Sequence, residues 1–255
     1  TKMGDFHAAI NSFEKAISLH PTYCEANYNL ANALYKIGKI TEAEISYRKA
    51  IDSNFDFAPA HNNLGLLLHK LKRFDEAESC FIESITLKPD YVDAHLNLGV
   101  TLKSKERYSD AIQCYERAIT LNPNYAEAYC NLGNLQRKLG ILSDAKKNHI
   151  KAIELKPTYF EAYCNLGSTL KDLGNYEGAK ASYQKSLELN KNHGETHYNL
   201  AVLLQEQNEL DRAEIHYRLC LTLNSSDTKA HCNLGVTLQE LGRLAEAEAE
   251  YRAAL

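Results

Sequence analysis

The stretch Glu127-Ala-Tyr-Cys-Asn-Leu-Gly-Asn134 contains the triplet Asn-Leu-Gly, which decides the fold because it recurs along the chain. The triplet, or its variant Asn-Leu-Ala, occurs seven times at a constant spacing of 34 residues. A constant spacing indicates one structural unit copied in series, and 34 residues is the period of a two-helix repeat. The asparagines of the seven triplets are Asn29, Asn63, Asn97, Asn131, Asn165, Asn199 and Asn233.

This register divides the chain into eight segments. Six complete units follow the second helix of a partial unit and precede a unit that stops within its second helix. The predicted segments are 1–23, 24–57, 58–91, 92–125, 126–159, 160–193, 194–227 and 228–255. Because arrays of this kind normally carry protective terminal elements, we expect the chain to be a piece of a longer array or of an array fused to another domain.

The apolar positions within each unit predict two amphipathic helices. Position 7 of every unit is leucine, position 8 is glycine or alanine, and position 20 is alanine. Position 24 is aromatic in every copy except one, where His149 stands. The apolar positions are spaced by 3 or 4 residues, which describes one face of a helix in each half of the unit. Glycine between the halves and proline after the second half mark helix ends, so we expect an all-α chain without strands.

Composition and charge narrow the class of partner. Hydrophobic residues make up 44% of the 255 residues, and no apolar run approaches a membrane span of ~20 residues. The net charge is −4 with acidic and basic residues interspersed, so we expect neither nucleic acid nor a membrane as a partner. The seven cysteines are an odd number without a CxxC pair, which favours reduced thiols and a cytoplasmic location.

No sequence motif of catalysis or of cofactor binding is present, so we expect no catalytic residue, no cofactor and no metal. His193 and His197 are four residues apart, but a unit boundary separates them, which favours a turn residue and a packing residue over a metal site. Cys130, Cys164 and Cys232 recur at position 5 of their units without an identifiable general base. We interpret these thiols as a small apolar lining.

The combination of Leu-Gly, Gly, Ala, aromatic, Ala and Pro at these offsets resembles the tetratricopeptide repeat over the whole chain. The resemblance implies a right-handed α-solenoid, or superhelix, of stacked 34-residue helix-turn-helix units. It also implies a concave groove lined by positions 2, 5, 6, 9, 12 and 13 of the first helices. The aromatic residue that often occupies position 4 in that family is replaced here by histidine in four units, and we interpret these histidines as structural. They are His61, His95, His197 and His231.

The asparagine of the triplet occupies position 6, on the presumed wall of the groove. Asparagine costs up to ~0.7 kcal/mol relative to alanine inside a helix, so its repetition calls for a compensating role. Its carboxamide offers a donor and an acceptor that can meet the N–H and C=O groups of an extended peptide. The alternative is that each carboxamide bonds to a neighbouring helix or to water, and the sequence leaves both interpretations open.

Segments 127–134 and 161–168 further resemble the repeats of nucleocytoplasmic O-linked N-acetylglucosamine transferases, in which an asparagine ladder selects protein substrates. In that family a separate glycosyltransferase domain performs the transfer. This chain contains no such domain, so the resemblance implies a substrate-recognition role only. Charged residues at positions 12 and 13 predict a groove that is positive at its start and negative at its end, where Asp172, Glu206 and Glu240 stand. Solvated helix ends are the alternative explanation of these charges.

The leading functional hypothesis is a non-catalytic scaffold that binds extended protein or peptide segments through the asparagine ladder. The alternatives are the recognition arm of a glycosyltransferase-like enzyme and a structural spacer that self-associates end to end. The predicted peptide-binding residues are Asn29, Asn63, Asn97, Asn131, Asn165, Asn199, Asn233, Lys103, Arg137 and Lys171.

Overall fold

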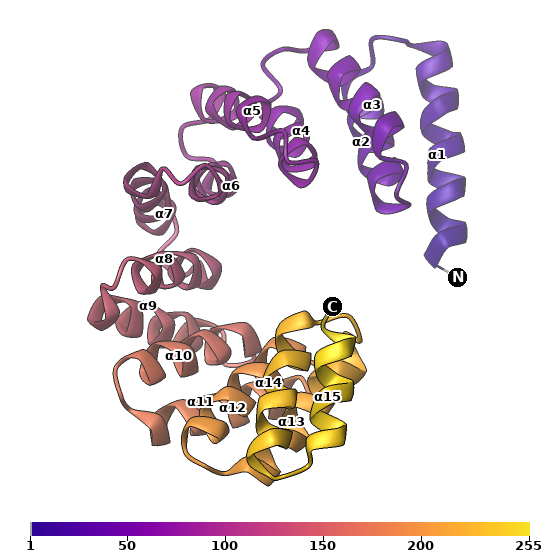
Figure 1. Cartoon of the computed structure of the whole chain (residues 1–255). Coiled ribbons are helices and arrows are strands. Elements are labelled where there is room, and N and C mark those ends of the chain that lie inside the picture. The colour runs from indigo at the N-terminus through magenta and orange to yellow at the C-terminus, as the bar shows by residue number, and fades with distance from the viewer. Residues whose placement is uncertain (1) are drawn as a thin grey trace. The chain divides into compact units, whose positions relative to one another are not determined.

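The computed structural model describes residues 2–255, with side chains from residue 6 onward. Thr1, the first residue of the expected partial unit, lies outside the described residues, and so do the side chains of residues 2–5. The described part of the chain folds into fifteen α-helices and contains no strand (Figure 1). The predicted all-α architecture of stacked helix pairs is therefore confirmed.

Helices of two kinds alternate along the chain after α1 (Lys2–Leu19). The first helices of the units are α2 (Cys24–Lys36), α4 (Ala58–Lys70), α6 (Val92–Ser104), α8 (Ala126–Lys138), α10 (Phe160–Asp172), α12 (Gly194–Glu206) and α14 (Thr228–Glu240). The second helices are α3 (Ile40–Ser53), α5 (Phe74–Leu87), α7 (Tyr108–Leu121), α9 (Leu142–Leu155), α11 (Tyr176–Leu189), α13 (Leu210–Leu223) and α15 (Leu244–Ala253).

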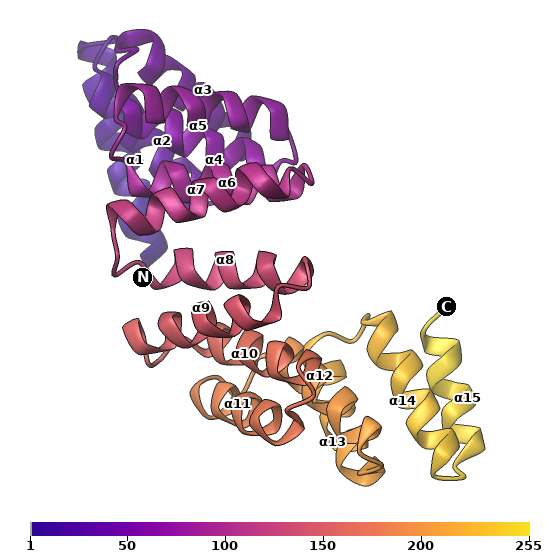
Figure 2. The same ribbon diagram turned by 90° about the vertical axis from the view of Figure 1, so that its left-hand side faces the viewer.

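The helices form two compact units, Thr1–Pro123 (unit 1) and Asn124–Leu255 (unit 2). Within each unit, every helix packs on its neighbours in sequence, as α14 and α15 do in Figures 1 and 2. Successive first helices also contact each other directly, as in α4 with α6 and α10 with α12. No pair of second helices in the described residues is in comparable contact. The stack is therefore tighter on the first-helix side, which makes that side the inner face of each unit.

In each helix pair, a ring at position 24 of the second helix packs on a glycine or alanine at position 8 of the first helix. The fully buried Tyr115 of α7 lies so close to α6 that a Cβ added at Gly99 would stand 2.6 Å from its Cε1 atom. In unit 2, a Cβ added at Gly167 would likewise stand 2.6 Å from the Cε1 atom of Tyr183. The ring occupies the space that a side chain at position 8 would need, so the recurring pair of positions 8 and 24 sets the separation of the two helices.

Ion pairs join the second helices of neighbouring repeats on the opposite side. Arg73 contacts Glu44 of the preceding repeat at 2.9 Å and Glu76 of its own helix at 2.6 Å. Arg243 bridges Glu214 and Glu246 at 2.6 Å each in the equivalent place. These pairs are partly exposed, so each contributes at most about 1 kcal/mol. Their main effect is to fix how one repeat sits on the next.

His149 of α9 is the exception to the aromatic pattern, and it has a cost. The side chain is fully buried against α8, and neither ring nitrogen has a hydrogen-bond partner among the described residues. Burial, together with the positive charge of Arg137, lowers the pKa of His149 from 6.5 to about 4. The imidazole therefore folds in its neutral form, with two polar atoms removed from water.

Replacing His149 with phenylalanine is expected to stabilise unit 2 by about 1–3 kcal/mol, because the substitution removes two unpaired buried nitrogens. Between the unfolded pKa of 6.5 and the folded value of about 4, the unfolded state binds more protons. Wild-type stability must fall as the pH drops through this range, and the variant should lose this part of the pH dependence.

Urea unfolding of both proteins at pH values of about 7.5 and 5 measures the effect. His149→Ala is the control, because it removes the titrating group but leaves a cavity. This variant should be less stable than H149F at both pH values. Equal pH dependence in the wild type and in H149F would contradict the explanation.

Gly99→Ala is expected to lower the free energy of unfolding by about 1–2 kcal/mol, since overpacking against Tyr115 outweighs the gain in helix propensity. The double variant with Tyr115→Leu should lose less than the sum of the two single losses, because the smaller side chain makes room for the new methyl group. Thermal and urea unfolding give the four values of this cycle. Additive losses would show that the two positions do not limit each other.

Candidate functional site

The predicted ladder asparagines lie on the first helices, and their exposure varies. Asn29 of α2 is exposed, and each of the other ladder side chains is partly buried. Asn63 lines a cavity of about 450 Å³ on the inner face of unit 1, together with residues of α2 and α3. Asn199 lines another of about 370 Å³ in unit 2. The carboxamides therefore stand at the surface, where a ligand can reach them.

In unit 2, each of three ladder carboxamides donates a hydrogen bond to position 5 of the preceding repeat. Asn165 Nδ2 donates to Cys130 Sγ at 3.3 Å, and Asn199 Nδ2 donates to Cys164 Sγ at 3.6 Å. Asn233 Nδ2 donates to Tyr198 Oη at 3.0 Å. One N–H group of each carboxamide is thus bonded to the neighbouring helix. Asn165 and Asn199 form no other side-chain hydrogen bond among the described residues, whereas the Asn233 side chain also interacts with Tyr217.

In unit 1, position-6 asparagines also donate to position 5 of the preceding repeat, but the accepting groups differ. Asn97 Nδ2 donates to Asn62 Oδ1 at 3.0 Å, again from position 6 to the preceding position 5. Asn63 Nδ2 donates both to Tyr28 Oη and to Asn32 Oδ1 at 2.9 Å, while Asn63 Oδ1 accepts from Asn62 Nδ2 at 3.0 Å. Both N–H groups of Asn63 are consumed, so the ladder is not chemically uniform. Sequence reasoning missed the acceptors at position 5, although they stand at a constant offset of 35 residues.

The cations that we expected to bind peptide are engaged within the protein in unit 2. Arg137 Nη1 lies 3.0 Å from Asp172 Oδ2, and Lys171 Nζ lies 2.8 Å from Glu206 Oε1. Each of these cations therefore neutralises an anion of the next repeat, and the predicted change of charge along the groove stays a prediction. Lys103 belongs to unit 1, where burial and the charge of Lys103 lower the pKa of His69.

Position-4 histidines anchor the turns that precede their helices. His61, His95 and His197 each place Nε2 2.8–2.9 Å from the carbonyl oxygen of the residue six positions earlier. His193 bonds to Thr196 Oγ1 at 2.6 Å, and His197 Nδ1 lies 3.0 Å from His216 Nδ1. Among the described residues, no group of three or more His, Cys, Asp and Glu side chains is arranged to hold a metal ion.

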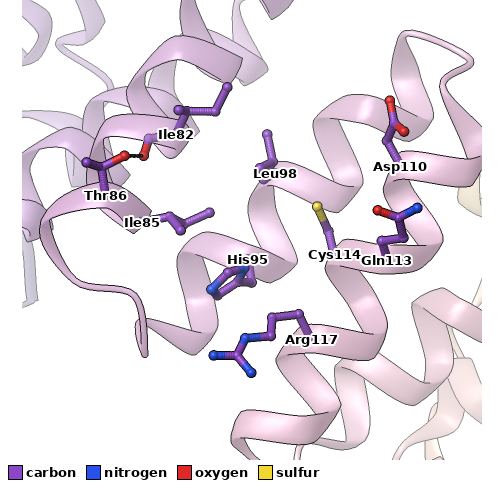
Figure 3. A pocket seen from close by; sticks show the side chains of 9 residues that line it. All are labelled: Ile82, Ile85, Thr86, His95, Leu98, Asp110, Gln113, Cys114 and Arg117. Carbon is purple, nitrogen blue, oxygen red and sulfur yellow. Dashed lines mark hydrogen bonds between the residues drawn. The ribbon is translucent and has the colours of Figure 1, made fainter.

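A groove of about 460 Å³ lies on the other side of unit 1, between α5, α6 and α7 (Figure 3). Ile82, Ile85 and Leu98 give it an apolar floor, and Asp110 and Arg117 stand beside it. It contains none of the predicted site residues. Unit 2 has a groove at equivalent repeat positions, between α11, α12 and α13, so this hollow is a regular consequence of repeat stacking.

The cysteines at position 5 differ in exposure. Cys130 and Cys164 are buried, whereas Cys232 is exposed. Burial raises the pKa of the Cys130 thiol, and it raises the pKa of Cys164 to about 11. All seven cysteines are free thiols.

In the described part of the chain, no helix combines the length and the apolar character that crossing a membrane requires.

Family models match most of the chain. Models described as TPR repeat match residues 1–38, 31–72 and 101–140. Models described as tetratricopeptide repeat match residues 58–91, 126–159, 160–193, 182–215 and 228–255. The search of curated proteins gives no match.

Solved structures with the same fold come from several proteins. The crystal structure of YrrB, described as a TPR protein with an unusual peptide-binding site, is 25% identical over 72% of this chain and 95% of its own, with a TM-score of 0.57. PilF of Pseudomonas aeruginosa is 22% identical over 76% of this chain and 88% of its own, with a TM-score of 0.69. The APC/C assembly Cut9-Hcn1 contains a chain 18% identical over 98% of this chain and 49% of its own, with a TM-score of 0.78.

Thiol accessibility gives a direct test of the position-5 geometry. At a pH of about 8, a thiol of pKa 11 is ionised to roughly one part in a thousand, so buried Cys164 should react very slowly with Ellman's reagent. Exposed Cys232 should react first, and Cys232→Ser should remove this fast phase. Reaction in denaturant should recover the slow thiols. Labelling of Cys164 as fast as that of Cys232 would contradict the packing.

Proposed function

The chain belongs to the tetratricopeptide repeat family, and we propose that it is a non-catalytic scaffold that binds extended polypeptide segments along the inner faces of its units. The fold is generally a protein-interaction scaffold, and YrrB is a similar protein described with a peptide-binding site. In our proposal, the ladder asparagines hold the backbone of the ligand. The ligand side chains then contribute to selectivity through the surrounding positions.

The observation that carries this proposal is the tethering of the ladder in unit 2. In Asn165, Asn199 and Asn233, one N–H group is fixed to the preceding repeat, and each of these residues is only partly buried. The tether restricts rotation of the carboxamide, so binding would cost less side-chain entropy than it would for a free asparagine. The remaining N–H and C=O groups match the acceptor and donor of a peptide unit.

The spacing of the first helices also suits an extended chain. Helices in direct contact lie ~8–10 Å apart, and each extended residue spans ~3.3 Å, so about every third peptide unit would meet a carboxamide. Backbone contacts at this interval do not read side chains. We therefore expect a broad range of ligands with moderate affinity.

Two alternatives rest on narrower grounds. The repeats at 126–159 and 160–193 resemble those of O-linked N-acetylglucosamine transferases, and in both of them a buried position-5 cysteine accepts the bond from the next ladder asparagine. This supports a substrate-recognition arm, and the full reading frame would reveal any attached catalytic domain.

End-to-end self-association is the other alternative, which light scattering tests. Free thiols on all seven cysteines favour a cytoplasmic location.

The ladder proposal predicts the effect of replacing Asn165, Asn199 and Asn233 together with alanine. The probe is a fluorescein-labelled, uncharged and unstructured Gly/Ser/Thr peptide, and its affinity should fall about tenfold or more with the loss of backbone hydrogen bonds. Side-chain amide resonances of the three asparagines should shift in ¹⁵N-correlated NMR spectra when the peptide is added to the wild type.

The matched control is Tyr198→Phe, which removes the acceptor that tethers Asn233 but keeps the carboxamide. This variant should bind the peptide better than N233A does. Circular dichroism should show that all variants stay folded. Unchanged affinity in the triple variant, with no amide shifts in the wild type, would refute the ladder.

A further inference from the structure

Positions 12 and 13 of successive first helices contact each other, and the chemistry of that contact differs between the units. In unit 2 the contact is an ion pair, as for Arg137 with Asp172 and Lys171 with Glu206. In unit 1 the same pair of positions places Lys70 Nζ 5.1 Å from the ring centre of Tyr35. An aromatic ring attracts the cation without cancelling its charge. The inner face of unit 1 therefore keeps a positive charge that unit 2 neutralises.

A second lysine reinforces that charge. Lys36 follows Tyr35 at position 13 of its own helix, and both Lys36 and Lys70 are exposed. Neither lysine forms an ion pair with a carboxylate in the described part of the protein. The acidic residue of α2 is Glu25, which lies eleven residues or ~16 Å from Lys36 along the helix axis, and α4 contains no acidic residue. The C-terminal ends of α2 and α4 thus form a basic strip, defined by Lys36 and Lys70.

A cavity opens beside the basic strip. It has a volume of about 450 Å³ and lies between α2, α3 and α4. Tyr35 and Lys36 line it from α2, and Asn63 and Leu66 line it from α4. Leu66 is 40% exposed there and adds apolar surface to the cavity wall. The site therefore combines cations with aromatic and aliphatic surface, and it is large enough for a side chain of a ligand.

We propose that the basic strip and its cavity bind an acidic polypeptide segment, whose carboxylates meet Lys36 and Lys70 while a neighbouring apolar side chain enters the cavity. This inference rests on the proposed function in one respect, that the ligand is an extended polypeptide on the inner face. It does not depend on the ladder, because both N–H groups of Asn63 are already used within the protein. Nucleic acid fits less well, since its binding rests largely on the neutralisation of many phosphates and the basic strip is defined by two lysines.

Three fluorescein-labelled Gly/Ser/Leu peptides of equal length test the proposal. They carry glutamate, glutamine or lysine at the same positions, and anisotropy is measured with the full chain at low salt and at ~0.15 M salt. The glutamate peptide should bind about tenfold more tightly than the lysine peptide at low salt, with a smaller ratio at higher salt. Equal binding of these two peptides would overturn the proposal.

The decisive variant is K36S/K70S, which should weaken binding of the glutamate peptide about fivefold or more and leave the glutamine peptide almost unchanged. The matched control K15S/K49S removes the same charge from two exposed lysines, on α1 and on α3. It should retain binding of the glutamate peptide. If it weakens binding as much as K36S/K70S does, the attraction comes from overall charge and the proposal fails.

A variant that should gain binding of the glutamate peptide provides an independent test. D172N/E206Q removes the anions that neutralise Arg137 and Lys171 in unit 2, so it should increase binding of the glutamate peptide. No increase would mean that unpaired cations at these positions do not attract such peptides.

A single-stranded oligonucleotide that binds more tightly than the glutamate peptide and loses binding in K36S/K70S would overturn the choice of polypeptide.

The two proposals fail in different ways. Loss of glutamine-peptide binding in the ladder variant, with no preference for glutamate in the wild type, would support the ladder and refute the basic strip. A strong preference for glutamate that disappears in K36S/K70S, with no effect of the ladder variant on either peptide, would refute the ladder and support the basic strip.

Discussion

The packing of a position-24 ring on a position-8 glycine or alanine is the contact on which the rest of the structure depends. Tyr115 against Gly99 shows why: the ring fills the volume that a side chain on the first helix would need. The two helices of a repeat can then approach closely, and the ring is fully removed from water. Since the ring comes from the second helix, it buries one face of the first helix and leaves the opposite face for contacts between repeats and with ligands. His149 meets the same steric requirement without hydrogen-bond partners, at a cost in stability.

Contacts between repeats follow a second rule, an offset of 35 residues. Position 6 reaches position 5 of the preceding repeat, and position 12 reaches position 13 of the following one. Both contacts arise because successive first helices touch while the second helices diverge. The geometry is constant, but the side chains that occupy it vary. Asn233 meets a tyrosine hydroxyl where Asn165 meets a thiol, and Lys171 meets a carboxylate where Lys70 meets a ring.

This variation gives the inner faces of the two units different chemistry. In unit 2, tethered carboxamides stand among ion pairs that cancel their own charge, which suits contacts to a peptide backbone. In unit 1, Asn63 is fully bonded within the protein, while Lys36 and Lys70 keep their charge beside a cavity. In our proposals, one repeated scaffold thereby supports two recognition modes, one based on backbone hydrogen bonds and the other on charge.

The sequence by itself determined the all-α fold, the pairing of helices and the position of the asparagines on the first helices. These features follow from periodicity, because Leu30, Ala43 and their equivalents can be buried only if each unit forms two helices packed together. Only the tertiary structure decided which partners the carboxamides and the charged side chains have. Arg137 and Asp172 looked like opposite ends of a charge gradient, but the stacking of neighbouring helices makes them one ion pair. Asn63 looked identical to Asn165, yet Tyr28 and Asn32 consume both of its N–H groups. A side chain's partners depend on which residues the next helix brings within about 3 Å, and linear spacing does not specify that distance.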